Sequence, residues 1–321
     1  MIVLLSVLCV VIFLSCNSLN YKDELVEAYY NLGNSYKDLG KLKESELVLA
    51  RAVQIDPSFS SAAYNLGMVQ ILSGEYKKGI DSLGFLLRKE PENTIALKVL
   101  AWGYYKNGDI IHAIEVYRQI LEIDTCNRDV LNNISILLIN QELYQEAYSY
   151  LVKLEDLGDA DENSLYNLGV VEKKLNLGSG LRWFELAYDK NPKLEKNIIA
   201  YIDALKTNHD FKRIISLYDD LITINPDPAY LFEKAFVLLT SIEDYDKGLS
   251  VLESALKEGY SNIDRIEELQ EYPDLLDRDK ILSVILANSS ETLSDDQGAL
   301  LEDLKGDQEK VPDLPVPDIQ G

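Results

Sequence analysis

The tetrapeptide Tyr-Asn-Leu-Gly occurs three times in this 321-residue chain, and its glycines are separated by multiples of one distance. Gly67 follows Gly33 by 34 residues, and Gly169 follows Gly67 by 102 residues, which is three times 34. A fixed period of roughly 20 to 50 residues indicates units that bury their apolar faces only by stacking on one another. The chain is therefore predicted to fold as an array of short repeats.

Four prolines carry the same spacing and mark the ends of units. Pro57 to Pro91 and Pro192 to Pro226 are each 34 residues, and prolines end helices. Between a glycine and the next proline, small and apolar residues follow a helical period, as at Tyr29, Leu32, Gly33 and Tyr36 and then at Ser45, Leu49 and Ala52. Each unit is therefore predicted to be two helices around a tight turn.

This pattern resembles the tetratricopeptide repeat, whose paired helices stack into a right-handed α-α superhelix. The resemblance covers residues 26–261 and implies an all-α solenoid of seven units, which begin near Val26, Ser60, Thr94, Arg128, Asp161, Glu195 and Ala229. The family places a small residue where one helix touches the next; Gly33, Gly67, Ala101 and Gly169 fill that position, whereas the last two units have Ile202 and Phe236 there. Two shorter helical patterns, Ile263 to Glu271 and Asp274 to Ala287, are predicted to form a cap within residues 262–288.

The first fifteen residues have the character of a signal peptide. Residues 2–14 are apolar except for Ser6, and as a helix they would reach only about 20 Å, less than a bilayer core. The junction Phe13-Leu14-Ser15-Cys16 resembles the bacterial lipobox in the relaxed form of spirochaetal lipoproteins. The resemblance implies acylation of Cys16, a tether over residues 16–25, and a place in the cell envelope on the periplasmic side or at the outer membrane. An uncleaved N-terminal anchor and a plain secretory signal remain open.

The other end of the chain, residues 289–321, carries nine acidic residues against two lysines, with three prolines near the terminus. This composition predicts a disordered acidic tail. A short linear motif around Val311 to Ile319 is the alternative.

Composition argues against several functions. Asp and Glu number 54 against 31 Lys and Arg, so the net charge is −23, whereas a nucleic-acid binder needs clustered positive charge. The three cysteines form no pair with metal-ligand spacing, and no nucleophile, metal cluster or cofactor loop can be identified. We therefore expect no catalytic residues, metal or cofactor, no small-molecule substrate and no nucleic-acid partner.

The first helices carry a second apolar line, rotated away from the one that packs on neighbouring helices. In tetratricopeptide proteins this line faces a concave groove, so the resemblance implies a binding site for a peptide or an amphipathic helix of a protein partner. The candidate residues are Tyr30, Asn34, Tyr64, Met68, Ile71, Lys98, Trp102, Tyr105, Ile136, Ile139, Tyr166 and Val170. The alternative is that these side chains fold back onto adjacent helices.

Lysines also gather along that line, and in so acidic a chain a local positive patch favours an acidic partner. They are Lys98, Lys106, Lys173, Lys174, Lys196 and Lys206. Taken together, the sequence predicts a non-catalytic interaction scaffold that a lipid anchors to the bacterial envelope. The alternatives are a subunit of an envelope assembly or transport complex whose groove holds a partner subunit, and, from another class, an enzyme with a groove ligand.

Overall fold

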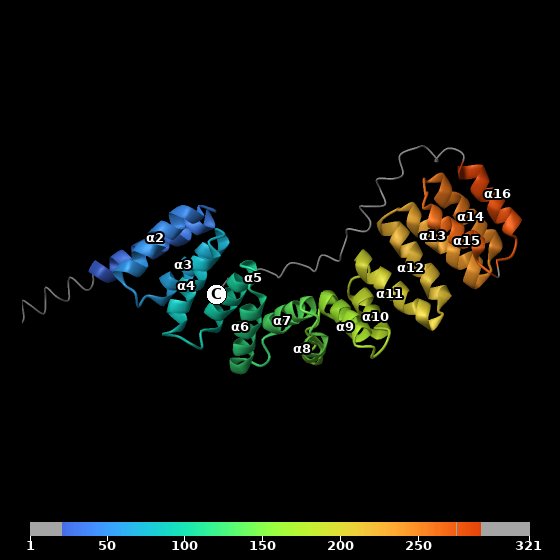
Figure 1. Ribbon diagram of the computed structural model, residues 1–321. Coiled ribbons are helices and arrows are strands. Elements are labelled where there is room, and N and C mark those ends of the chain that lie inside the picture. The colour runs from blue at the N-terminus through green and yellow to red at the C-terminus, as the bar shows by residue number, and fades with distance from the viewer. Residues whose placement is uncertain (1–20, 274, 290–321) are drawn as a thin grey trace, which may run out of the picture. The chain divides into compact units, whose positions relative to one another are not determined.

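The computed structural model describes residues 21–273 and 275–289, and every regular element in these ranges is a helix (Figure 1). The prediction of an all-α tetratricopeptide-type solenoid is confirmed. The predicted signal peptide, Cys16 and almost all of the acidic tail lie outside the described residues.

The described chain forms two compact units, and the boundary between them falls at Gln141 and Glu142, within the fourth predicted repeat. The first unit holds a helix over residues 21–38, then α2 (Leu42–Ile55), α3 (Ser60–Leu72), α4 (Tyr76–Leu87), α5 (Thr94–Lys106), α6 (Ile110–Ile123) and α7 (Arg128–Asn140). The second unit holds α8 (Tyr144–Asp156), α9 (Glu162–Lys174), α10 (Leu181–Lys190), α11 (Glu195–Asn208), α12 (Phe211–Ile224), α13 (Pro228–Val237), η1 (Leu238–Ile242), α14 (Tyr245–Lys257), α15 (Ile263–Glu271) and α16 (Arg278–Ser289).

Close contact within each helix pair explains the repeated small residues. A Cβ added to Gly67 of α3 would lie 2.6 Å from Cγ of Leu83 in α4, and no heavy atom tolerates that distance. In the first pair the Ser45 hydroxyl of α2 donates a 2.7 Å hydrogen bond to the Gly33 carbonyl, which ties a side chain of the second helix to the backbone of the first. The small residues therefore recur once per repeat because each marks the point where the two helices of a pair are in contact.

The turn between the two helices of a pair also repeats. Gly40, Gly74 and Gly108 have φ angles of 70°, 84° and 81°, a left-handed conformation that glycine adopts without steric cost. At the corresponding turns further along, Glu142, Asn176, His209 and Glu243 take φ angles from 55° to 61°. The backbone thus keeps the left-handed residue even where the sequence no longer supplies glycine.

The seventh pair departs from the pattern, and the sequence did not predict how. Helix α13 runs on into η1, one turn of π-helix, instead of ending in a simple turn. The bulky Phe236 stands in the small-residue position, and the small residue of this pair is Gly248 of α14, where a Cβ would lie 2.6 Å from Cδ2 of Leu239.

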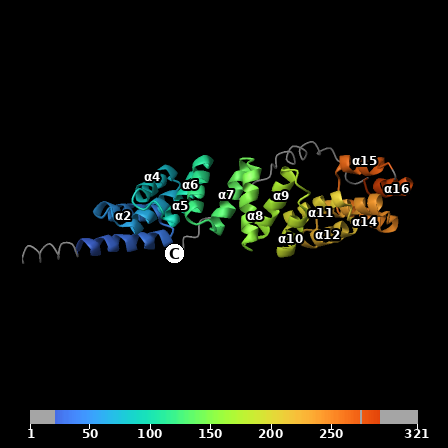
Figure 2. The ribbon, with the colours of Figure 1, turned by 90° about the horizontal axis from the view of Figure 1, so that it is seen from below.

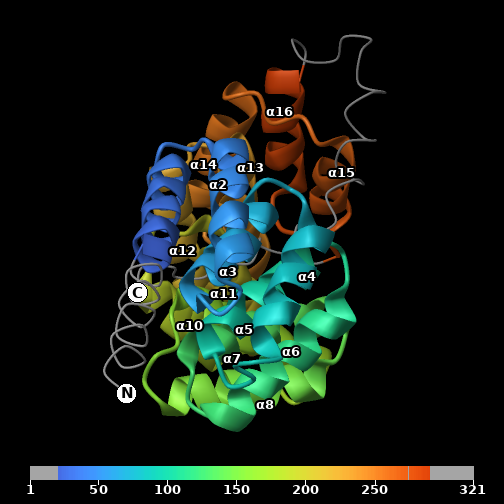
Figure 3. The same ribbon diagram turned by 90° about the vertical axis from the view of Figure 1, so that its left-hand side faces the viewer.

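The last two helices cover the apolar end of the second unit. Leu269 of α15 and Ile281 and Ile285 of α16 are buried in one core cluster with Phe232 and Leu252. Helix α16 packs on α14 and α15, and the three helices lie together in Figures 1, 2 and 3. Helix α15 begins and ends where the sequence periodicity indicated.

Candidate functional site

A groove of about 1000 Å³ runs over the second unit. The first helices of successive pairs, α9, α11 and α13, and then α15, form its walls, while α10 and α12 contribute side chains from behind. Six helices thus contact one continuous space.

The floor of the groove is apolar. Phe184 of α10 and Tyr218 and Leu221 of α12 are buried at its base, together with Ile202 of α11. Ile199 and Ala200 of α11 and Val170 of α9 retain more exposure along the same surface. An occupant would therefore bury apolar side chains against the middle of the groove.

The rim of the groove carries more positive than negative charge. Its basic side chains are Lys173, Lys174, Lys196, Lys206 and Arg265, and its acidic ones are Asp203 and Glu233. Both acids already have basic partners: Lys173 Nζ lies 2.5 Å from Asp203 Oδ2, and Arg265 holds Glu233. The exposed Lys174 and Lys206 have no hydrogen-bond or ion-pair partner among the described residues. The groove thus presents free positive charge within a chain of net charge −23.

Lys196 is a positioned cation in the groove wall. Its Nζ donates a 2.8 Å hydrogen bond to Asn163 Oδ1 and lies 4.9 Å from the centroid of the Tyr166 ring. Burial lowers the pKa of Lys196, because desolvation disfavours the charged form, while the nearby Asp161 and Glu162 oppose that shift. A carboxylate entering the groove would meet this ammonium at a fixed place.

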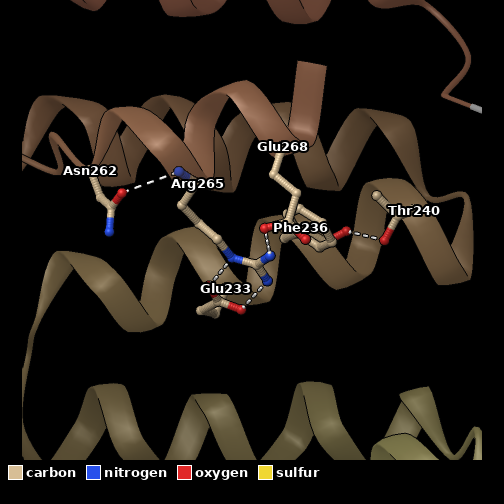
Figure 4. Close-up of polar contacts among 6 residues, drawn as sticks. All are labelled: Glu233, Phe236, Thr240, Asn262, Arg265 and Glu268. Atoms are coloured by element: carbon tan, nitrogen blue, oxygen red, sulfur yellow. Dashed lines mark hydrogen bonds and ion pairs between the residues drawn. The ribbon is translucent and has the colours of Figure 1, made fainter. Parts of the chain in front are cut away.

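Arg265 lines the groove and joins α15 to α13 (Figure 4). Its Nε and Nη2 donate to the two carboxylate oxygens of Glu233 at 2.7 and 2.9 Å, and Nη1 also donates to Glu268. The guanidinium lies 4.1 Å from the centroid of the Phe236 ring, and the hydrogen bonds to Glu233 raise the pKa of Arg265 further above its usual range. The paired, stacked guanidinium fixes this wall.

A tyrosine ties α13 to α11 on the same wall. The Tyr230 hydroxyl donates to the Glu195 carboxylate, and burial together with this hydrogen bond raises the pKa of Tyr230. Because the Tyr230 hydroxyl is neutral, the contact leaves the negative charge of Glu195 in place next to this lining residue.

The predicted inner line falls into two parts. Tyr166 and Val170 line this groove, and so do four of the six lysines, Lys173, Lys174, Lys196 and Lys206. The remaining candidates, from Tyr30 to Ile139, lie in the first unit, as do Lys98 and Lys106. The structure therefore brings only the later part of the line together around this space.

Four first-unit candidates are core residues, which corrects the prediction that they line an open groove. Met68 and Ile71 are each 1% exposed, Ile136 is 5% exposed and Trp102 is 6% exposed. Gly103 gives the reason: a Cβ there would lie 2.6 Å from Cδ1 of Ile71, so the next first helix already fills the space over that side chain. For these residues the alternative, packing onto adjacent helices, is the observed one.

The other first-unit candidates are partly exposed, and three of them have partners within the fold. Asn34 Oδ1 accepts a 2.7 Å hydrogen bond from Asn65, Lys98 Nζ lies 3.1 Å from Asp129, and the Tyr30 ring meets Phe59 edge-on at 5.3 Å. Tyr64, Tyr105 and Ile139 are half-buried, and burial raises the pKa of Tyr64. They remain candidates for contact with a partner.

Sequence reasoning missed several residues of the groove, although α11 carried a signal. Ile199 and Asp203, which were missed, recur at three- or four-residue spacing with the predicted Lys196 and Lys206 and so share one face of that helix. Tyr230 and Glu233 follow the same rule on α13. Arg265 had no such signal, because it lies beyond the last repeat.

Other chemistry is sparse in the described ranges. Residues 21–273 and 275–289 contain no group of three His, Cys, Asp or Glu side chains that could hold a metal ion. Within the same ranges no helix has both the length and the apolar character to cross a bilayer.

Comparisons with known proteins agree with the architecture. A family model described as tetratricopeptide repeat matches residues 26–59. The BBSome complex member bbs-4 of Caenorhabditis elegans is 23% identical over 205 residues, 64% of this chain and 44% of that protein. The type IV pilus assembly protein PilF of Pseudomonas aeruginosa is 26% identical over 184 residues, 55% of this chain and 56% of that protein. The chain thus spans about half the length of these relatives or less.

A solved structure supports the fold as well. A tetratricopeptide repeat protein from Parabacteroides merdae superposes with a TM-score of 0.53 at 19% identity, covering 78% of this chain and 98% of that one. Together these findings support a protein of the tetratricopeptide repeat type.

The core position of Trp102 has a measurable consequence. Trp102→Ala should lower the free energy of unfolding by about 3–5 kcal/mol, because it leaves a cavity among buried neighbours. Ile95→Ala is the matched control, since Ile95 lies on the same helix but is 54% exposed. Chemical denaturation followed by circular dichroism separates the two variants. A Trp102 variant as stable as the Ile95 variant would contradict the core assignment.

Proposed function

We propose that the protein is a non-catalytic scaffold that holds an extended, acidic segment of a partner protein in the groove of the second unit. The observation that carries the proposal is the combination of an apolar floor with the unpaired Lys174 and Lys206 on the rim. The floor offers apolar contact, and the rim selects for negative charge.

The form of the groove favours a polypeptide over a compact ligand. Its walls are the row of helices α9, α11, α13 and α15, and the axes of packed helices stand about 8–10 Å apart, so the groove extends over roughly 30 Å. An extended segment of about nine residues covers that length at about 3.1 Å per residue. Alternating acidic and apolar side chains would reach the rim and the floor in turn.

A second candidate function is permanent membership of an assembly, with a partner subunit seated in the same groove. The names of two relatives favour it: one is a member of the BBSome complex and the other a pilus assembly protein. A partner that stays bound through purification at one copy per chain would favour the assembly, whereas exchange within minutes would favour the scaffold.

The rim lysines provide the test of the groove. Lys174→Gln with Lys206→Gln should weaken binding of a fluorescein-labelled peptide of about twelve alternating Asp and Leu residues about tenfold, because two exposed ion pairs are lost. Fluorescence anisotropy at fixed ionic strength measures the affinity.

Lys190→Gln with Lys212→Gln is the matched control. Both lysines are exposed in the second unit, lie outside the groove, and remove the same charge when replaced. This pair should leave the affinity within about twofold. Equal weakening by the two pairs would mean that overall charge, and not the groove, attracts the peptide. No binding to either the unaltered chain or the chain truncated after Ser290 would overturn the proposed function.

We also propose that acylation of Cys16 anchors the protein to the envelope membrane. The support is the sequence around Cys16, which stands at the end of an apolar segment and lies outside the described residues. Metabolic labelling with a radioactive fatty acid in a bacterial host should label the unaltered chain and a Cys126→Ser control, whose cysteine is exposed in a turn. Cys16→Ser should remove the label, and a label that persists would contradict the anchor.

A further inference from the structure

The C-terminal segment of the chain has the chemistry that the groove of the second unit selects. Residues 290–321 contain nine Asp or Glu residues and two lysines, whereas the groove carries five basic and two acidic side chains. Both acids of the groove already have basic partners, so an incoming carboxylate meets unpaired lysines.

The last residues of this segment also match the apolar part of the groove. Residues 311–319 read Val-Pro-Asp-Leu-Pro-Val-Pro-Asp-Ile, in which four aliphatic residues alternate with two aspartates and three prolines. Prolines exclude a helix and favour an extended backbone, which lowers the entropy lost on binding. Nine extended residues cover roughly 28 Å, close to the roughly 30 Å expected for four adjacent helices.

The connection is long enough for the segment to reach the groove of its own chain. Helix α16 ends at Ser289, in the same unit as the groove, and 21 residues separate it from Val311. An extended chain of that length spans up to about 70 Å, more than twice the expected length of the groove. A tether of this kind holds its end at an effective concentration near the millimolar range.

We infer that residues 311–319 of the same chain occupy the groove when no partner is bound, so that the acidic segment acts as a built-in competitor. The inference rests on the proposed function, since it assigns the same groove an internal ligand. A partner must then displace the segment. The apparent affinity of the partner equals its intrinsic affinity multiplied by the fraction of molecules whose groove is open.

The test compares three forms of the protein with the same Asp-Leu probe. They are the full chain, a chain truncated after Ser290, and a full-length chain carrying Asp313→Asn and Asp318→Asn. All three retain every described helix, and thermal melting checks that they are equally folded. The truncated chain should bind the probe about tenfold more tightly than the full chain, and the Asn variant should lie between them. A free peptide of residues 291–321 should displace the probe from the truncated chain.

The outcomes separate the inference from the proposed function. Equal affinity of the full and truncated chains for the probe would overturn the inference and leave the proposed function standing. Failure of every form to bind the probe would overturn the proposed function. Inhibition that disappears on dilution, together with dimers in sedimentation, would assign the segment to a second copy and overturn its placement within one chain.

Discussion

Contact between the two helices of each pair is the constraint on which the rest of the structure depends. At Gly67 the distance to Leu83 leaves no room even for a methyl group, and the Ser45 hydroxyl bonds directly to the Gly33 carbonyl. In a pair packed this closely, the second helix covers only one side of the first helix and leaves another face of it uncovered. That face is where neighbouring pairs pack or where a groove opens.

The two units use that face differently, and the side chains explain the difference. In the first unit, Ile71 fills the space beside Gly103, and Trp102 is almost fully buried, so part of the inner line becomes core. In the second unit the same line carries lysines at the ends of α9 and α11, and charged side chains do not enter a core without partners. They stay on the rim and leave the apolar floor open between them.

The period of the sequence was enough to predict the helix pairs, because the small residues at the helix contacts recur in the sequence at the repeat spacing. The sequence did not predict the left-handed turns at Glu142 and Glu243 or the π-turn after α13. Neither residue type nor spacing marks them, since packing against neighbouring helices sets the backbone conformation there. Four groove lysines were predicted from one line of residues. Arg265 was missed because it enters the site from a helix outside the repeat, through tertiary contact with Glu233.

The central claim is that the groove of the second unit binds acidic polypeptide, and a photo-cross-link tests it most directly. Benzoylphenylalanine in place of Ile199, a 45% exposed groove residue, should cross-link the acidic peptide to the chain truncated after Ser290. The same group in place of Ser216, exposed on α12 outside the groove, should give no cross-link above background. A cross-link of equal yield at both positions, or at position 216 alone, would contradict the account.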